Sequence, residues 1–288
     1  MKEIFQWLRK IEQHASEIYQ KASVKLSHDE FFSTFLSQLA EDESWHCRIM
    51  DSALSQISAA KNPPISEITF DDSTASRLEK PLVILSSQIE KNVVSRQDVV
   101  NCIVDAEFSE WNRIFLYAIN ILKEESKEFQ YAAASIQEHE KRIRKFLDLL
   151  PSDIIFSKKI LELPTIWEQS ILVVEDDDPL RELVSVILSK TGRIDTAANG
   201  LDALEKVKRN YYNVIISDID MPDMNGLEFF ESAIKTDPLL AKRFIFCTGN
   251  ITIEKEKFFL EHGVSHIRKP FDIFQFQEII NKRLSESL

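Results

Sequence analysis

The chain has 288 residues, of which 44% are hydrophobic and 28% charged, and its formal net charge at pH 7 is −12. This length favours two domains, and the hydrophobic content is enough for two packed cores. The acidic balance without a basic run argues against nucleic-acid binding, and no apolar run approaches the ~20 residues that span a bilayer, so we expect a cytoplasmic protein without a membrane segment.

Residues 1–150 carry apolar residues every three or four positions, which is the period of an amphipathic α-helix. Capping-box-like starts occur at Ser27-His28-Asp29-Glu30 and Ser95-Arg96-Gln97-Asp98. Asn62-Pro63-Pro64 interrupts the second helical pattern, with an extended stretch to about Thr74, and Pro151 ends the last pattern. The pattern therefore predicts helices near residues 2–26, 29–60, 77–92, 96–122 and 126–150.

A connector of residues 151–169 follows, and its apolar side chains, including Ile160 and Leu161, predict that it packs on a domain. From residue 170, short apolar runs alternate with amphipathic helical segments. Because strands that alternate with helices form parallel sheets, we expect a doubly wound, five-stranded α/β domain of the flavodoxin-like class over residues 170–288. The expected strands are Ile171–Val174, Arg193–Ala197, Val214–Ser217, Phe244–Cys247 and Val264–Ile267.

Polar side chains follow the carboxyl ends of these strands, which is the edge where such sheets bind ligands. They are Glu175 and Asp176 after the first strand, Asp218 and Asp220 after the third, Thr248 after the fourth and Lys269 after the fifth. Phosphoryl transfer to a carboxylate needs such a set, because Mg²⁺ takes carboxylate and carbonyl oxygens while a lysine and a hydroxyl stabilise the remaining phosphate oxygens. The spacing predicts a phosphoryl-transfer site at this edge.

The segments ILVVEDDDP and SDIDMPDMNG, with Thr248 and Lys269-Pro270, closely resemble the response-regulator receiver family over residues 170–288. The resemblance implies that Asp218 accepts a phosphoryl group from a sensor histidine kinase. It also implies that Thr248 and Lys269 hold the phosphate, and that the Lys269-Pro270 bond is cis. Mg²⁺ would be bound by Glu175, Asp176, Asp218 and the backbone carbonyl of Asp220. Such a domain catalyses only its own phosphorylation and dephosphorylation, so we do not expect an enzyme.

His266 departs from the receiver pattern, which usually has Tyr or Phe three residues before the lysine. An imidazole could rotate towards Thr248 as the second part of the switch, and imidazoles can change charge near neutral pH. The alternative is a half-exposed histidine without a switching role. Asp220 and Asn250, two residues after the acceptor and the threonine, occupy positions that tune phosphate hydrolysis in the family.

The helical half places acids on the apolar stripes of four predicted helices. Buried carboxylates are costly unless they are paired or bind metal. One arrangement that uses them is a di-metal bundle, with single glutamates from two helices and Glu-x-x-His from two others. The candidate ligands are Glu12, Glu43, His46, Glu107, Glu110 and Glu140.

The segments IEQHASEIY, LAEDESWH and Glu107-Phe108-Ser109-Glu110 resemble the rubrerythrin/ferritin-like family over residues 1–150, which implies a di-iron site. Aligning IQEHEKRI with LAEDESWH places Ile143 where the second histidine would be. His139 lies about 100° round the helix from Glu140 and is expected to be a poor substitute. The alternative is a bundle without metal, whose acids pair with Arg48, Arg113 or water.

These observations predict a two-component response regulator that signals through its helical half by contact with an unknown downstream protein. No DNA-binding element is expected after the receiver, and a homodimer is left open. One alternative is a di-iron regulator that senses redox state or oxygen. Another is a phosphorelay intermediate with a phosphotransfer histidine such as His14, His28 or His46, although none has the usual Lys-Gly context.

Overall fold

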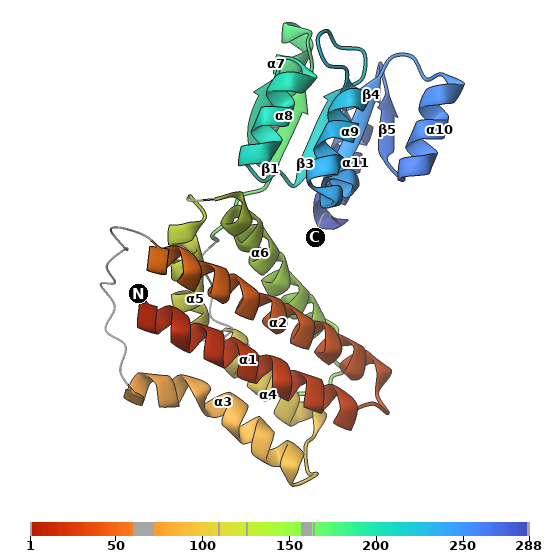
Figure 1. The fold of residues 1–288 in the computed structure, drawn as a ribbon. Coiled ribbons are helices and arrows are strands. Elements are labelled where there is room, and N and C mark those ends of the chain that lie inside the picture. The colour runs from red at the N-terminus through yellow and green to blue at the C-terminus, as the bar shows by residue number, and fades with distance from the viewer. Residues whose placement is uncertain are drawn as a thin grey trace. The chain divides into compact units, whose positions relative to one another are not determined.

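The computed structural model describes residues 2–59, 72–108, 110–124, 126–156, 163 and 165–286 (Figure 1). The chain forms two compact units. The first comprises Met1–Glu125 and Ser135–Ile166, and the second comprises Ser126–Ala134 and Trp167–Leu288. Within the described residues, no helix is long and apolar enough to cross a membrane.

The first unit is helical, as the sequence pattern predicts. Its helices are α1 (Lys2–Lys25), α2 (Glu30–Ala59), α3 (Asp72–Glu90), α4 (Arg96–Glu107), α5 (Glu110–Leu122) and α6 (Lys127–Asp148). The first turns of α6, up to Ala134, belong to the second unit. The helix predicted over residues 96–122 is interrupted, because α4 ends at a C-cap on Phe108 and α5 begins at Glu110. Ser95 begins α4 with the expected capping box.

Helix α3 begins at Asp72, so the extended stretch predicted up to Thr74 is wrong for its last residues. The break expected at Asn62-Pro63-Pro64 lies outside the described residues, as do Ile160 and Leu161 of the connector. Of the connector residues that are described, Ile166 is buried and Ile155 is 78% exposed. The connector is therefore apolar in sequence without being uniformly buried.

The apolar stripes predicted for α1 and α2 are buried, and the two helices lie side by side in the bundle (Figure 1). Leu8, Glu12, Ala15 and Tyr19 of α1 are at most 1% exposed. The spacing of four, three and four residues returns these side chains to one helix face, which is why this face also carries a carboxylate into the core.

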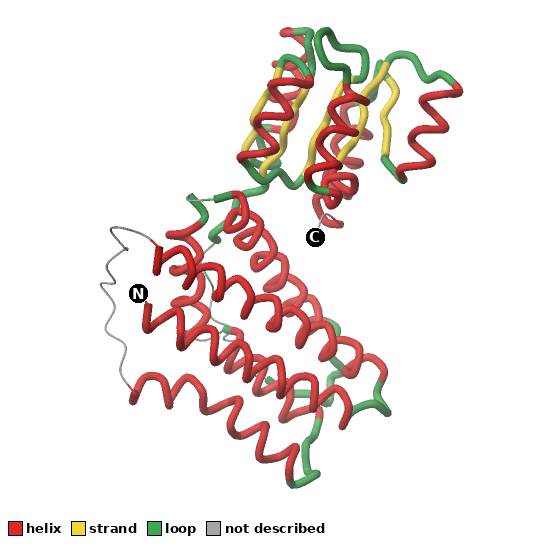
Figure 2. The backbone as a smooth tube through the Cα atoms, viewed as in Figure 1, coloured by secondary structure: helices red, strands yellow, loops and turns green. Residues whose placement is uncertain are grey.

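The second unit contains a five-stranded parallel sheet with strand order β2-β1-β3-β4-β5 (Figure 2). Its strands are β1 (Ser170–Val174), β2 (Arg193–Ala197), β3 (Val214–Asp218), β4 (Phe244–Thr248) and β5 (Ser265–Arg268). Every residue of β1, β3 and β4 is buried, as expected for strands covered on both faces. The predicted doubly wound sheet is confirmed, with strand bounds within one residue or so of the sequence pattern.

Helices cover both faces of this sheet. They are α7 (Asp178–Leu188), α8 (Gly200–Arg209), α9 (Gly226–Thr236), α10 (Ile253–His262) and α11 (Ile273–Glu286), with a 3₁₀ turn at Pro238–Arg243. One apolar core joins α7 and α11 to the sheet, and the other joins α8, α9 and α10. Chain order reverses between the neighbouring strands β1 and β3, so their carboxyl ends form the crevice where doubly wound sheets bind ligands.

Candidate functional site

The carboxyl ends of β1 and β3 bring three acids together. Glu175 and Asp176 follow β1, and Asp218 is the last residue of β3. One carboxylate oxygen from each lies within 4.8 Å of the others. Glu175 and Asp218 are buried and Asp176 is exposed, so the group opens to solvent on one side. Carboxylates at this spacing, open to water, suit Mg²⁺, which keeps part of its hydration shell when bound.

Lys269 lies against this group, as its position after β5 predicts. Its Nζ is 2.7 Å from Glu175 Oε2 and 3.2 Å from Asp218 Oδ2. Burial raises the pKa of Glu175. For Lys269, burial lowers the pKa, but the hydrogen bond to Glu175 and the charge of Asp218 outweigh it and raise the pKa overall. The lysine is therefore held as a cation beside the Asp218 carboxylate. The Lys269-Pro270 bond is cis, as the family resemblance implies.

The Asp218 carboxylate is oriented by its own backbone. Its Oδ1 accepts a hydrogen bond from Ile219 N at 2.8 Å, which leaves Oδ2 on the side of Lys269. Thr248, at the end of β4, is fully buried, and its hydroxyl donates to the carbonyl of Asn250 at 3.2 Å. The Asp218 carboxylate, the Thr248 hydroxyl and the Lys269 ammonium thus reach one edge from β3, β4 and the end of β5.

Two residues of this site were missed by sequence reasoning. Gly226 begins α9 next to Asp218, and a Cβ there would lie 2.1 Å from the backbone oxygen of Asp218. The glycine in SDIDMPDMNG is the signal that could have identified this close approach. The second is Lys255 of α10, whose Nζ is 2.9 Å from each carboxylate oxygen of Asp220 and 3.5 Å from Thr248 Oγ1.

His266 is exposed on β5, and its ring stacks on Phe259 of α10 with centroids 4.5 Å apart and planes at 18°. This contact accounts for the orientation of the imidazole. A switching role for His266 together with Thr248 stays a prediction.

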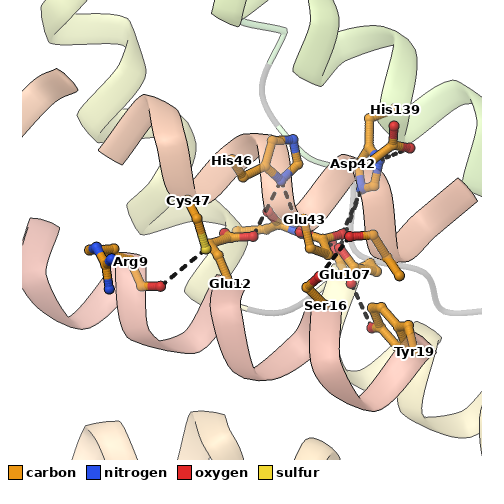
Figure 3. A network of polar contacts seen from close by, with 12 residues as sticks. Arg9, Glu12, Ser16, Tyr19, Asp42, Glu43, His46, Cys47, Glu107 and His139 are labelled. Atoms are coloured by element: carbon orange, nitrogen blue, oxygen red, sulfur yellow. Dashed lines mark hydrogen bonds and ion pairs between the residues drawn. The ribbon is translucent and has the colours of Figure 1, made fainter. Parts of the chain in front are cut away.

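A second polar cluster lies inside the helical unit (Figure 3). His46 Nδ1 is 3.2 Å from Glu12 Oε2 and 2.9 Å from Glu43 Oε2. On the other side of Glu43, His139 Nε2 is 3.4 Å from Glu43 Oε1 and 3.7 Å from Glu107 Oε2. All five side chains are at most 5% exposed. The two groups, Glu12–Glu43–His46 and Glu43–Glu107–His139, each have metal-ligand spacing and share the Glu43 carboxylate.

Surrounding side chains fix the orientation of these groups. Asp42 Oδ2 is 3.0 Å from His139 Nδ1 and accepts from Arg142 at 2.8 Å. The Tyr19 hydroxyl donates to Glu107 Oε1 at 2.7 Å. A carboxylate on the far nitrogen of a histidine is the arrangement that orients histidine ligands in metal sites.

The buried charges shift one another's protonation. Burial raises the pKa of Glu43, and the neighbouring charges of Glu107 and Glu12 raise it further. For His139, burial lowers the pKa, but the bond to Asp42 and the charge of Glu107 outweigh it and bring the pKa to about 9. Glu43 Oε1 and His139 Nε2 nevertheless have no hydrogen-bond partner among the described residues. Two unsatisfied buried atoms 3.4 Å apart are costly unless something binds between them.

The structure corrects the predicted ligand set at α6. Glu140 does not join the cluster, because it pairs with Arg144 at 2.8 Å, and Ile143 does not mark a missing imidazole. His139, which was expected to be a poor substitute, lies in the cluster instead, with its Nε2 3.4 Å from Glu43 Oε1, and its role as a metal ligand stays a prediction. His139 and Ile143 lie about 40° apart around the helix axis, because four residues make slightly more than one turn. The orientation of α6 about its own axis directs the His139 side chain into the core of the helical unit.

With His139 as ligand, the α6 motif becomes Ile136-Gln137-Glu138-His139, and it lacks a glutamate at Ile136. The described part of the cluster therefore has three carboxylates, from Glu12, Glu43 and Glu107, where the di-metal pattern has four. The Glu110 side chain lies outside the described residues, as does that of Arg113. Arg48 donates to Ser44 rather than to the clustered acids.

Comparison with known proteins identifies the second unit. Residues 171–281 match the family model of the response regulator receiver domain. The parallel sheet and the edge that carries Asp218 agree with that assignment, so this part of the chain is a receiver domain.

Three curated proteins illustrate the range of similar sequences. Transcriptional regulatory protein CrdR of Helicobacter pylori is 34% identical over 120 residues, which are 40% of this chain and 54% of that protein. A protein-glutamate methylesterase/protein-glutamine glutaminase of Anaeromyxobacter dehalogenans is 36% identical over 104 residues, 35% of this chain and 29% of that protein. Sporulation initiation phosphotransferase F of Bacillus subtilis is 28% identical over 117 residues, 40% of this chain and 94% of that protein.

The chain spans about half the length of the first of these relatives and less than a third of the second. The second shows that a similar receiver can belong to an enzyme, so the expectation of a non-enzymatic protein is untested for the whole chain. The first unit is established as helical, and its membership of the rubrerythrin/ferritin-like family stays a prediction that these comparisons do not support.

Proposed function

We propose that this protein is a two-component response regulator whose Asp218 accepts a phosphoryl group from a sensor histidine kinase. The observation that supports this most directly is the convergence of Glu175, Asp218 and Lys269, with Lys269 Nζ within 3.2 Å of both carboxylates. The names of the relatives, a transcriptional regulatory protein and a phosphotransferase, agree with signalling by phosphoryl transfer.

In this proposal Asp218 Oδ2 attacks the phosphorus of the kinase phosphohistidine, the P–N bond breaks, and the kinase imidazole leaves, while Oδ1 keeps the hydrogen bond from Ile219 N. Lys269 leaves its place beside Asp218 Oδ2 to bind a phosphoryl oxygen, and Thr248 turns its hydroxyl from Asn250 to another. Bound Mg²⁺, held by Glu175, Asp176 and Asp218 with the carbonyl of Asp220, would neutralise phosphate charge. Movement of Thr248 and Lys269 then couples phosphorylation to the α10 and β5 surface, where His266 lies.

The test is phosphorylation of the full chain by acetyl phosphate with Mg²⁺. We expect Asp218→Asn to abolish incorporation, because an amide does not act as the nucleophile. Asp223→Asn is the matched control, since Asp223 is an exposed acid in the following loop. Incorporation that persists in Asp218→Asn at the wild-type level would show that another residue is the acceptor.

The output of the proposed regulator is a protein–protein contact made by its helical unit with a downstream partner. A phosphorelay role is disfavoured for His46, because this side chain is 4% exposed and bonded to two carboxylates. Among the three candidate histidines, His28 is exposed and His14 half-buried. Transfer of phosphate from either to Asp218, followed with labelled protein, would favour the relay.

We also infer a second function, in which the helical unit binds two divalent cations that share Glu43. Support comes from Glu43 Oε1 and His139 Nε2, which are buried, lack a hydrogen-bond partner among the described residues and lie 3.4 Å apart. The carboxylate and imidazole donors suit iron, which would supply a redox couple for sensing oxidants. The residues of this chain orient the donors: Asp42 fixes the His139 ring, and Tyr19 fixes Glu107.

Elemental analysis of protein purified with and without oxygen tests this second proposal. We expect up to two ions per wild-type chain and a large loss in Glu43→Gln. Glu140→Gln makes the same chemical change at a neighbouring α6 acid outside the cluster and should bind as wild type does. Wild-type protein without metal after anaerobic purification and iron addition would refute the proposal and favour a metal-free bundle.

A further inference from the structure

Lys255 lies at the edge of the phosphoacceptor site without a role in the mechanism above. It stands in the first turn of α10, where Thr252 caps the helix by accepting a hydrogen bond from Lys255 N. Its Nζ is 2.9 Å from Asp220 Oδ1, 2.9 Å from Oδ2 and 3.5 Å from Thr248 Oγ1. The lysine thus bridges the residue two positions after the acceptor and the hydroxyl proposed to hold a phosphoryl oxygen.

The environment of this ammonium differs from that of an ordinary surface ion pair. The Lys255 side chain is 13% exposed, whereas its partner Asp220 is 62% exposed. Burying an ammonium costs free energy, and an ion pair with a solvent-exposed carboxylate offsets little of that cost. For comparison, Lys257 on the same helix has a side chain that is 75% exposed and lies 3.7 Å from Glu261.

A phosphoryl group on Asp218 would bring about two negative charges to this edge. Lys269 would compensate these charges from one side, next to Glu175 and Asp218. Lys255 is a cation on the Thr248 side, and a phosphoryl oxygen bonded to the Thr248 hydroxyl would lie within reach of its flexible side chain. A full phosphate charge is a stronger partner for an ammonium than a solvent-exposed carboxylate.

We propose that Lys255 is a second phosphoryl-binding lysine, which exchanges Asp220 for the phosphoryl oxygen that Thr248 holds. Asp220 then acts as a competitor that keeps Lys255 at the site before phosphorylation and is released afterwards. This inference rests on the proposed function, because it requires Asp218 to be the acceptor.

The test measures binding of beryllofluoride, a stable phosphoryl analogue, to the full chain in the presence of Mg²⁺ by ¹⁹F NMR. We expect Lys255→Ala to weaken beryllofluoride binding about tenfold, which corresponds to about 1.4 kcal/mol, the scale of one charge-assisted hydrogen bond. Lys255→Arg should retain most of the affinity, and Lys257→Ala should bind as wild type does. The affinity for Mg²⁺ alone should be the same in all four proteins, whereas a general loss of structure would lower it.

Asp220→Asn completes a double-mutant cycle, since it removes the competitor and leaves the backbone carbonyl in place. We expect Asp220→Asn to tighten beryllofluoride binding more in the wild-type background than in the Lys255→Ala background. Equal effects in both backgrounds, or wild-type affinity in Lys255→Ala, would overturn the role of Lys255. If the wild-type chain does not bind beryllofluoride with Mg²⁺, the proposed acceptor site is refuted instead.

Discussion

Replacing Glu43 by Gln should have opposite effects on the stability of the helical unit without and with metal. Glu43 is 1% exposed, and both of its oxygens face other buried groups of the cluster. Without metal, the substitution removes a desolvated carboxylate next to Glu12 and Glu107. Because burial and the charges of Glu107 and Glu12 raise the pKa of Glu43 and so favour its neutral form, a neutral amide of the same shape should leave the free energy of unfolding unchanged or raise it. With metal, the same substitution removes the ligand shared by both ions.

The magnitude follows from linkage. At a free metal concentration 100 times the dissociation constant, a bound ion stabilises the folded state by about 2.7 kcal/mol. A domain of this size changes its melting temperature by about 2–4 °C for each kcal/mol, so wild-type protein should gain about 5–11 °C for each ion that it binds. Glu43→Gln should lose most of this gain.

The assay is a thermal melt followed by circular dichroism at 222 nm, with metal and with chelator, under anaerobic conditions. Glu140→Gln is the matched control, because Glu140 pairs with Arg144 outside the cluster and should keep the wild-type gain. A metal-induced gain in Glu43→Gln as large as in wild type would refute the shared-ligand geometry. A melting temperature that falls strongly in metal-free Glu43→Gln would refute the claim that the carboxylate is desolvated and repelled.

Three further predictions follow from named contacts. Asp42→Asn should weaken metal binding about 10–100-fold, measured by competition with a chromophoric chelator, because His139 loses its orienting carboxylate. Gly226→Ala should destabilise the receiver unit by about 1–3 kcal/mol in urea unfolding, since the new Cβ meets the Asp218 backbone, whereas Gly249→Ala has nothing within 4 Å and should have no such steric cost. Lys269→Ala should still take up phosphate slowly but lose any phosphorylation-dependent change in hydrodynamic size or partner binding. A phosphorylated mutant that responds like wild type would contradict this readout.

The receiver fold and its edge could be predicted from the order of residues alone. The buried strand Val214–Asp218 is apolar up to its last two residues. Turn residues mark helix starts elsewhere in the domain, as Asn199-Gly200 does for α8. Parallel strands end at one edge, so acids after β1 and β3 must meet there once the sheet forms. Local pattern and chain direction are sufficient for this inference because neither depends on the detailed packing of side chains.

Side-chain partners at that edge could not be predicted in the same way. Lys255 is 35 residues from Asp220, and nothing local in α10 indicates that its first turn packs over Thr248. The break between α4 and α5 is similarly a property of the fold, because the apolar period continues through residues 96–122 while the helix ends at Glu107.

The helical unit shows the division between sequence and tertiary structure most clearly. Periodicity placed Glu12, Glu43, His46 and Glu107 on buried faces, and all four are buried. On α6 the same periodicity favoured Glu140, and His139 was expected to be a poor substitute, although each lies on one flank of the apolar stripe. The orientation of α6 against α2 places His139 in the core, where it is 5% exposed. Glu140 lies outside the cluster and pairs with Arg144. A stripe defines a helix face to within a wide arc, but a ligand must point in one direction, and only the packed neighbours set that direction.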